Sequence, residues 1–316
     1  MTKSIHGNQF MTKSIHFDQK LLIRGNVMII DAHVHLWKTQ TGRRDDSPVR
    51  TLENGLSDFG GEIKQMMPPY MITGENSPEM LIANMNYAGV NGAVIVTEVM
   101  DGNQNEYFKA AKAKYPDRLK ICAFYDDGDP YTLDGFDGIK ICACKFKQPG
   151  IGRHIEVFEK ANKENKFVCI ELEDGDAQTG EMKEIIQQFP DLRIAIGHFG
   201  MVTRENWLEQ IKLARYKNVF VESGGITWLF NEEFYPYPSA IKAINEAAEI
   251  CGFDKLMWGS DYPRTMVEIT YKMSYDFVTK SKEISEENKA KFLFENAKNF
   301  YGFDNLPELP KIENML

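Results

Sequence analysis

The chain has 316 residues, of which 43% are hydrophobic and 26% charged, as in globular proteins with a large core. A net charge of -9 argues against a nucleic-acid or anionic-membrane partner, because no basic stripe is present to neutralise phosphates. No run approaches the roughly 20 apolar residues of a membrane helix. The five cysteines match no disulfide scaffold and no signal-peptide core is visible, which predicts a reducing, cytoplasmic location.

The N-terminus carries a short tandem duplication. The polar segment MTKSIH at 1–6 recurs at 11–16, and it is too short to be a fold repeat. We therefore interpret residues 1–27 as an N-terminal extension, residues 28–303 as one folded domain and residues 304–316 as a surface tail. His6 and His16 are not expected to carry chemistry.

An apolar run at 29–37 ends in a His-x-His pair. A run of Val, Met and Ile without turn residues predicts a strand that is buried on both faces. His33 and His35 are two residues apart, so both imidazoles point the same way on an extended chain. Such a pair can hold a divalent cation or polarise a carbonyl oxygen, or it can be a structural, hydrogen-bonded pair.

Strands and helices are predicted to alternate from residue 28 onward. The expected strands span 28–33, 92–96, 120–124, 138–142, 167–172, 193–198, 218–223 and 255–260. The expected helices span 79–88, 104–115, 154–164, 180–189, 204–216, 239–252, 265–280 and 285–301. Alternation implies right-handed crossovers and a parallel sheet. Eight units at this length predict an α/β fold, a (β/α)8 TIM barrel, with an open doubly wound sheet as the alternative.

Two links depart from this pattern. The link from residue 125 to 137 contains Asp-Gly and Asp-Pro turn signals and leaves little room for a helix. The link from 38 to 77 has no clear periodicity, so we expect a long excursion without secondary structure. In a barrel this excursion emerges at the C-terminal face, where active sites are built, and a lid function is expected.

Polar residues cluster at the predicted carboxyl ends of the strands. They are His33 and His35 after the first strand, Glu171 and Glu173 after the fifth, His198 after the sixth and Asp261 after the eighth. Imidazoles and carboxylates that converge on a barrel mouth are the ligands of a mononuclear divalent metal site. The remaining histidine, His154, is assigned a surface or packing role.

Five segments together resemble a known family. They are IIDAHVHLW at 29–37, GHFG at 197–200, NVFVESG at 218–224, LMWGSDYPR at 256–264 and NAKNFYG at 296–302. This pattern is similar to the amidohydrolase superfamily, specifically amidohydrolase family 2. His-x-His alone is a weak signal, but its combination with Gly-Ser-Asp-Tyr-Pro is strong. The resemblance extends over nearly the whole segment from residue 28 to about residue 302.

The resemblance implies roles for four residues. His33 and His35 would be metal ligands or, in metal-free members, groups that polarise the oxyanion. Asp261 would ligate the metal and act as general base, and His198 would orient the substrate or polarise its carbonyl. The expected cofactor is one divalent ion, zinc or manganese, with metal-independent activity as the alternative. The expected metal set is His33, His35, Glu171, His198 and Asp261.

One departure from the family pattern bears on the reaction. Many members have a histidine at the end of strand five, where this chain has Glu171, the substitute ligand expected here. Members similar to 2-pyrone-4,6-dicarboxylate lactonase and L-fuconolactonase also lack it, which favours a hydrolase that opens a lactone or small carbonyl ester. The alternative is a metal-dependent decarboxylase, similar to aminocarboxymuconate-semialdehyde or resorcylate decarboxylases, which retain that histidine. A remote alternative is a catalytically silent binding barrel.

The expected partner is a small, carboxylated molecule. Arg264, Trp37 and Glu173 are the candidate substrate-binding residues. The Arg264 guanidinium can clamp a carboxylate or pair with an acidic neighbour. Lys140 lies in the middle of a predicted strand, where a salt bridge is the simpler interpretation. Homodimers are common among similar proteins, and the sequence leaves the oligomeric state open between a monomer and a homodimer.

Overall fold

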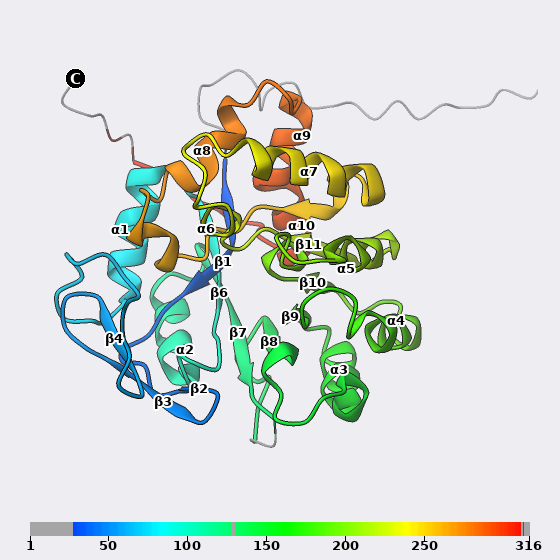
Figure 1. Ribbon diagram of the computed structural model, residues 1–316, viewed down its shortest axis with the longest axis horizontal. Coiled ribbons are helices and arrows are strands. Elements are labelled where there is room, and N and C mark those ends of the chain that lie inside the picture. The colour runs from blue at the N-terminus through cyan, green and yellow to red at the C-terminus, as the bar shows by residue number, and fades with distance from the viewer. Residues whose placement is uncertain (1–27, 128–129, 311, 313–316) are drawn as a thin grey trace, which may run out of the picture.

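The computed structural model describes residues 28–127, 130–310 and 312. The N-terminal extension therefore lies outside the described residues. Eight parallel strands form one sheet in the order β1-β6-β7-β8-β9-β10-β11-β12 (Figure 1). They span β1 (Ile30–His35), β6 (Gly92–Val96), β7 (Leu119–Tyr125), β8 (Gly138–Cys142), β9 (Phe167–Glu171), β10 (Ile194–Ile196), β11 (Val219–Glu222) and β12 (Leu256–Met257). The predicted TIM barrel is confirmed.

The barrel closes between β1 and the segment that follows β12. Backbone hydrogen bonds run from Ala32 N to Trp258 O at 3.0 Å and from Asp261 N to His33 O at 3.0 Å. A third runs from His35 N to Tyr262 O at 2.7 Å. Closure therefore places Asp261 beside His33 and His35, although Asp261 lies more than 200 positions after the two histidines in the sequence.

Helices cover the outside of the sheet (Figure 1). They are α1 (Pro78–Ala88), α2 (Asn105–Lys114), α3 (Ile155–Lys163), α4 (Thr179–Gln188), α5 (Trp207–Lys212), α6 (Ile226–Leu229), α7 (Pro238–Cys251), α8 (Met273–Lys280), α9 (Glu286–Ala290) and α10 (Asn296–Tyr301). The start of α1 follows from its sequence, because the Ser77 hydroxyl accepts from Met80 N at 3.2 Å and Pro78 opens the first turn. The predicted helix at 265–280 is divided in two, with a 3-10 turn over Arg264–Val267 before α8.

Alternate strand residues build two separate apolar layers. The outward residues, such as Ile95, Ile139 and Ile170, pack beneath the helices. Inward residues such as Cys122 and Cys169, in the middles of β7 and β9, form a second cluster with α10. The rings of Phe167 and Tyr301 lie 4.9 Å apart within that cluster. Helix α10 therefore closes the N-terminal end of the barrel and leaves the other end for chemistry.

We expected the excursion at 38–77 to lack secondary structure, and this expectation is wrong. It forms a four-stranded antiparallel sheet of β2 (Arg43–Arg44), β3 (Ser47–Thr51), β4 (Leu56–Phe59) and β5 (Ile63–Gln65). Strands this short give too few alternations to reveal a period. The one clear signal was Asn54-Gly55, a hairpin turn in which both residues have positive φ, at 58° and 74°.

The small sheet lies against the C-terminal end of the barrel, as predicted. Arg43 N donates to Val99 O at 3.1 Å, just beyond β6. The Arg43 guanidinium also pairs with Asp126 at 2.7 Å, just beyond β7.

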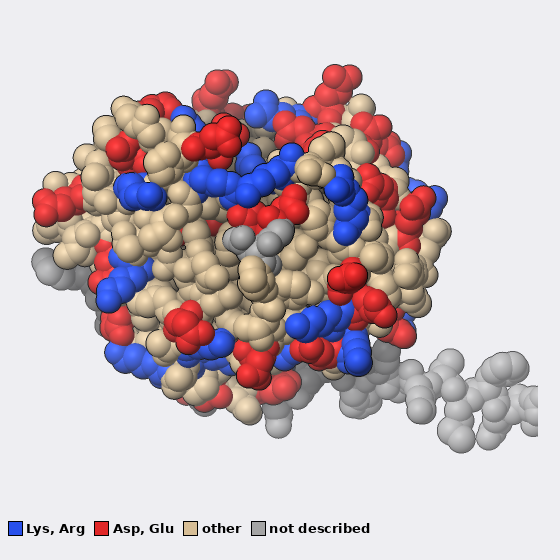
Figure 2. All heavy atoms as spheres, turned by 90° about the horizontal axis from the view of Figure 1, so that it is seen from below, with Lys and Arg blue, Asp and Glu red and all other residues tan. Residues whose placement is uncertain are grey.

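The face seen in Figure 2 carries Lys and Arg side chains interspersed with Asp and Glu. Among the described residues, no helix has both the length and the apolarity that a membrane crossing requires.

Candidate active site

A bulge in β1 turns both histidines toward the barrel interior. Ile30 and Ala32 pack in the inward apolar cluster, and the pairing register with β6 shifts between Asp31 and Val34. His33 and His35 consequently reach the interior, although their parity differs from that of Ile30 and Ala32. The Asp31 carboxylate supports the irregular backbone by accepting from His33 N at 3.0 Å and from Ser260 N at 2.9 Å.

The three imidazoles of the site are each held at Nδ1. Glu222 Oε1 lies 2.7 Å from Nδ1 of His33, and Asp101 Oδ2 lies 3.1 Å from Nδ1 of His35. The carbonyl oxygen of Gly224 accepts from Nδ1 of His198 at 2.8 Å. Carboxylate or carbonyl partners of this kind fix the ring orientation and leave Nε2 free to act as a ligand. Nε2 of His33 and Nε2 of His35 lie only 3.1 Å apart.

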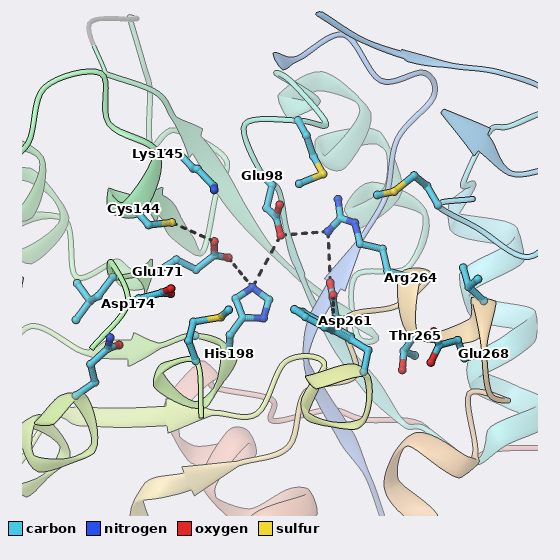
Figure 3. A pocket seen from close by; sticks show the side chains of 18 of the residues that line it. Glu98, Cys144, Lys145, Glu171, Asp174, His198, Asp261, Arg264, Thr265 and Glu268 are labelled. Carbon is cyan, nitrogen blue, oxygen red and sulfur yellow. Dashed lines mark hydrogen bonds and ion pairs between the residues drawn. The ribbon is translucent and has the colours of Figure 1, made fainter. Parts of the chain in front are cut away.

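Three carboxylates face these Nε2 atoms (Figure 3). Asp261 Oδ1 lies 2.9 Å from Nε2 of His35, and Glu171 Oε1 lies 3.0 Å from Nε2 of His198. Glu98 Oε1 lies between the two, 3.9 Å from each Nε2. Glu98 was not among the site residues that we expected from the sequence. It follows the end of β6 by two residues, so the strand-end rule that selected the other carboxylates would have found it.

The donor atoms are arranged as two overlapping quartets. One consists of His33, His35, Glu98 and Asp261, and the other of His33, Glu98, Glu171 and His198, with the atoms of each within 4.8 Å of one another. All five residues expected to bind metal thus lie together, with Glu98 in addition. When Nδ1 of His33 donates to Glu222, Nε2 of His33 presents a lone pair toward Nε2 of His35, which a cation bound by both atoms would satisfy. The residues therefore fit a divalent metal ion.

A buried ion pair supports the carboxylate of Glu171. Lys140, which is 1% exposed, donates its ammonium to Glu171 Oε1. Burial alone would raise the pKa of Glu171, but the Lys140 and His198 charges outweigh it and hold this pKa well below its usual range. In turn, the Glu171 carboxylate outweighs burial and raises the pKa of Lys140. The predicted salt bridge of Lys140 is present.

The charged groups around the cavity floor have shifted pKa values. Burial disfavours the charged form of His198, but the adjacent Glu171 carboxylate raises the pKa of His198 to about 10. Burial also opposes ionisation of Asp261, yet the hydrogen bond from His35 and the Arg264 charge lower its pKa. For His33, burial is the first cause and lowers the pKa well below its usual value. The site therefore presents an ionised Asp261, a positively charged His198 and a neutral His33.

Arg264 pairs with acidic neighbours. Its guanidinium lies 2.8 Å from Asp101 Oδ1, 3.2 Å from Glu98 Oε1 and 3.4 Å from Asp261 Oδ1. The carboxylates Glu98, Asp101, Glu171 and Asp261 outnumber the three cations of the site, which are Lys140, Arg264 and the charged His198. This excess of negative charge also suits a divalent cation.

Two expected substrate-binding residues lie away from the cavity. Trp37 is fully buried, its Nε1 donates to Gly74 O at 3.0 Å, and its ring lies 5.8 Å from the Arg264 guanidinium carbon. It therefore supports Arg264 and does not form a pocket wall. Glu173 lies beyond the end of β9, where its carboxylate accepts from Gln178 Nε2 at 3.2 Å. Because β9 ends at Glu171, strand alternation no longer aligns the two glutamates.

A cavity of about 450 Å³ opens above this cluster (Figure 3). Its floor includes Glu98, Glu171, His198 and Asp261. Its walls come from several loops: Gln65, Met66, Met100, Cys144, Lys145, Leu172, Asp174, Gly197, Met201, Gln210, Trp228, Arg264, Thr265, Val267 and Glu268. Gln65 and Met66 belong to the 38–77 excursion, which therefore contributes to the site. The volume lies within the range of small-molecule pockets.

The backbone is strained where the site is built. His198, Phe199 and Asp261 have positive φ values of 50°, 52° and 61°, a region that costs energy for residues other than glycine. Trp228 Nε1 donates to Asp261 Oδ2 at 2.8 Å and holds that side chain in place. Gly259 gives His33 its room, because a Cβ there would lie 2.8 Å from His33 Cβ.

Glu222 and Asp101 were also missed, although each has a signal in the sequence. Glu222 is the penultimate residue of the predicted strand at 218–223 and the last residue of β11, and Asp101 lies in the loop after β6. Both are buried and hold the histidine rings.

His154 lies apart from the site, with Nδ1 2.7 Å from the Tyr125 hydroxyl and its ring 4.1 Å from that of Phe146.

The comparisons with known proteins agree with the barrel fold and with the resemblance found in the sequence. Residues 177–303 match the family model Amidohydro_2, described as amidohydrolase. This segment carries His198 and Asp261, and the match agrees with the resemblance found in the sequence. No curated protein sequence matches significantly.

Solved structures share the fold at low sequence identity. A Pseudomonas putida protein, named as a 2-pyrone-4,6-dicarboxylic acid hydrolase, is 17% identical with a TM-score of 0.65, over 89% of this chain and 99% of that chain. A Burkholderia multivorans amidohydrolase with bound zinc is 12% identical with a TM-score of 0.63, over 89% and 100%. A 2,6-dihydroxybenzoate decarboxylase is 15% identical with a TM-score of 0.53, over 71% and 87%.

Proposed function

We propose that the protein is a hydrolase that opens a lactone or a similar small carbonyl ester. The observation that carries this proposal is the pairing of two groups on one cavity. Asp261 is ionised by its contacts with His35 and Arg264, and His198 is held positively charged by Glu171. Both line the same cavity. Ester hydrolysis by water requires a proton acceptor for the water and a charged hydrogen-bond donor for the carbonyl oxygen, and both are present in this cavity.

The proposed reaction is the attack of water on an ester carbonyl. Asp261 accepts a proton from a water molecule whose oxygen attacks the ester carbonyl carbon. The carbonyl oxygen gains negative charge, which His198 stabilises from Nε2. When the bond between the carbonyl carbon and the ester oxygen breaks, Asp261 returns the proton to the departing alkoxide. The products are a carboxylic acid and an alcohol, in one molecule when the substrate is a lactone.

A divalent ion, zinc or manganese, would be held by His33, His35 and Asp261. Glu98 is a better candidate than Glu171 for the remaining position, because Glu98 lies in the same quartet as these three residues and Glu171 does not. The ion would supply Lewis-acid polarisation of the substrate carbonyl. Hydrolysis without metal is the alternative, in which the charged imidazole of His198 polarises the carbonyl.

A screen of lactones and esters against the purified full-length protein tests the proposal. Acid release is followed with a pH indicator and carbon dioxide is measured in parallel, with metal content determined by elemental analysis. Acid without carbon dioxide is the expected result. Stoichiometric carbon dioxide from an aromatic or unsaturated carboxylic acid, without ester hydrolysis, would establish the decarboxylase alternative and overturn the proposal.

A further inference from the structure

The cavity has an unusual distribution of charge. Its floor and rim carry the carboxylates Glu98, Glu171, Asp174, Asp261 and Glu268. Arg264 also lines the cavity, but Glu98, Asp101 and Asp261 occupy its guanidinium. Lys145, just after β8, is the one lining cation without an ion-pair partner among residues 28–127, 130–310 and 312. Its side chain is exposed and extends over Glu171 (Figure 3).

Apolar side chains cover much of the remaining wall. Three methionines come from three different loops: Met66 from the 38–77 excursion, Met100 from the loop after β6 and Met201 from the loop after β10. Trp228 adds an aromatic ring next to Asp261. Thioether side chains adapt to flat or irregular apolar bodies, and they make favourable contacts with aromatic rings. This lining is suited to an apolar ring and is poorly suited to a ligand that is polar throughout.

We infer that the substrate is a compact, largely apolar ring that carries a single carboxylate, which Lys145 anchors at the mouth of the cavity. This inference rests on the proposed function, because the ester carbonyl must reach Asp261 and His198 at the floor. A second carboxylate at the rim would meet Asp174 or Glu268, where no unpaired lining cation remains, and like charges repel. Lys145 is thus a specificity-determining residue, and a dicarboxylate is disfavoured in this chain.

Binding of three unreactive probes tests the inference independently of catalysis. On the same ring, benzoate carries one carboxylate, isophthalate carries two and benzamide carries none. Isothermal titration calorimetry on the full chain should give benzoate an affinity about tenfold higher than the other two, a difference that one ion pair can supply. Isophthalate binding as tightly as benzoate, or no binding of benzoate at 10 mM, would overturn the inference.

Two variants sharpen the test. Lys145→Met should remove the preference for benzoate over benzamide while leaving benzamide binding within twofold, and Lys147→Met, which lies outside the cavity lining, should change neither. Glu268→Lys supplies a second cation at the rim and should raise isophthalate affinity about tenfold. An unchanged benzoate preference in Lys145→Met contradicts the assignment of Lys145. Absence of ester hydrolysis with the predicted binding pattern would overturn the proposed function alone.

Discussion

The two ends of the barrel use the same strands for opposite purposes. In the middles of β7 and β9, the inward residues are Cys122 and Cys169, which pack with Phe300 and Tyr301 of α10. Lys140 faces the interior from the middle of β8, and Glu171 and Glu222 face it from the carboxyl ends of β9 and β11, all at most 7% exposed. A shift of one or two positions along a strand thus changes the interior from apolar to charged.

This difference separates stability from chemistry. Burying apolar side chains at the α10 end stabilises the fold, by roughly 25 cal/mol for each Å² removed from water. Burying Lys140, Glu171 and Asp261 at the other end carries a desolvation cost that close pairing offsets only in part. Positive φ values at His198 and Asp261 add strain at the same end. Substitutions at the two ends should therefore change different observables.

The largest effect is expected at Asp261. In Asp261→Asn the carboxylate that accepts the proton is replaced by an amide of the same shape, so kcat on an ester substrate should fall by about 10²–10⁴-fold. The variant should keep its circular dichroism spectrum. The matched control is Asp191→Asn, an exposed residue just before β10 at the opposite end of the barrel. Turnover of Asp261→Asn within threefold of the parent protein would remove Asp261 from the mechanism.

The second prediction concerns the ion pair beneath the cavity. Lys140→Met leaves the Glu171 carboxylate buried without its ammonium partner, so the free energy of unfolding should fall by about 3–5 kcal/mol. Urea unfolding measures this change. In the double variant Lys140→Met with Glu171→Gln no uncompensated charge remains, and part of the loss should be recovered. If the losses of unfolding free energy in Lys140→Met and Glu171→Gln simply add in the double variant, the two residues are not coupled.

The third prediction is made at the apolar end. The Phe300 ring lies 5.0 Å from that of Phe220 and 6.0 Å from that of Phe167. Phe300→Ala should lower the free energy of unfolding by about 3 kcal/mol while kcat per folded molecule stays unchanged. Phe234→Ala is the control, because Phe234 is 90% exposed and its loss should cost less than about 0.5 kcal/mol. A fall in kcat with intact binding would show that the two ends are not separable.

Much of the barrel could be predicted because its strands are buried on both faces. The spans 92–96 and 138–142 match β6 and β8 residue for residue, since both begin at a glycine and are rich in the β-branched residues Val and Ile. The sheet of β2 to β5 could not be predicted from periodicity, because its strands have two to five residues and expose most side chains. The Asn54-Gly55 turn was the signal that could have found it.

The site was predictable wherever a residue stands at the end of a strand. His33, His35, Glu171, His198 and Asp261 all follow that rule, and the structure brings them together. Arg264 shows its limit, since nothing in the chain reveals that Asp101 and Glu98 fold over to occupy it. Trp37 and Glu173 were misplaced for a related reason. Adjacency in sequence to a site residue says little about direction once a strand has ended.

The smallest effect is expected at His154, a polar group buried near the catalytic end but outside the site. Burial lowers the pKa of His154, an effect that Asp127 opposes and Arg153 adds to, while the neighbouring Tyr125 hydroxyl accepts or donates at Nδ1. The unfolded chain, whose histidine pKa is about 6.5, therefore binds a proton at higher pH than the folded chain does. Stability should fall as the pH decreases through about 6.5 and level off below the folded pKa.

Urea unfolding at pH 7.5 and pH 5.5 measures that dependence against a matched variant. His154→Gln keeps a polar group beside Tyr125 but cannot take up a proton, so its loss of stability between the two pH values should be smaller than that of the parent protein. Because His154 lies outside both metal quartets, the variant should bind zinc with unchanged stoichiometry. Equal losses in the two proteins would mean that His154 titrates alike in the folded and unfolded chains, and that burial near the catalytic end perturbs only the groups that converge on the cavity.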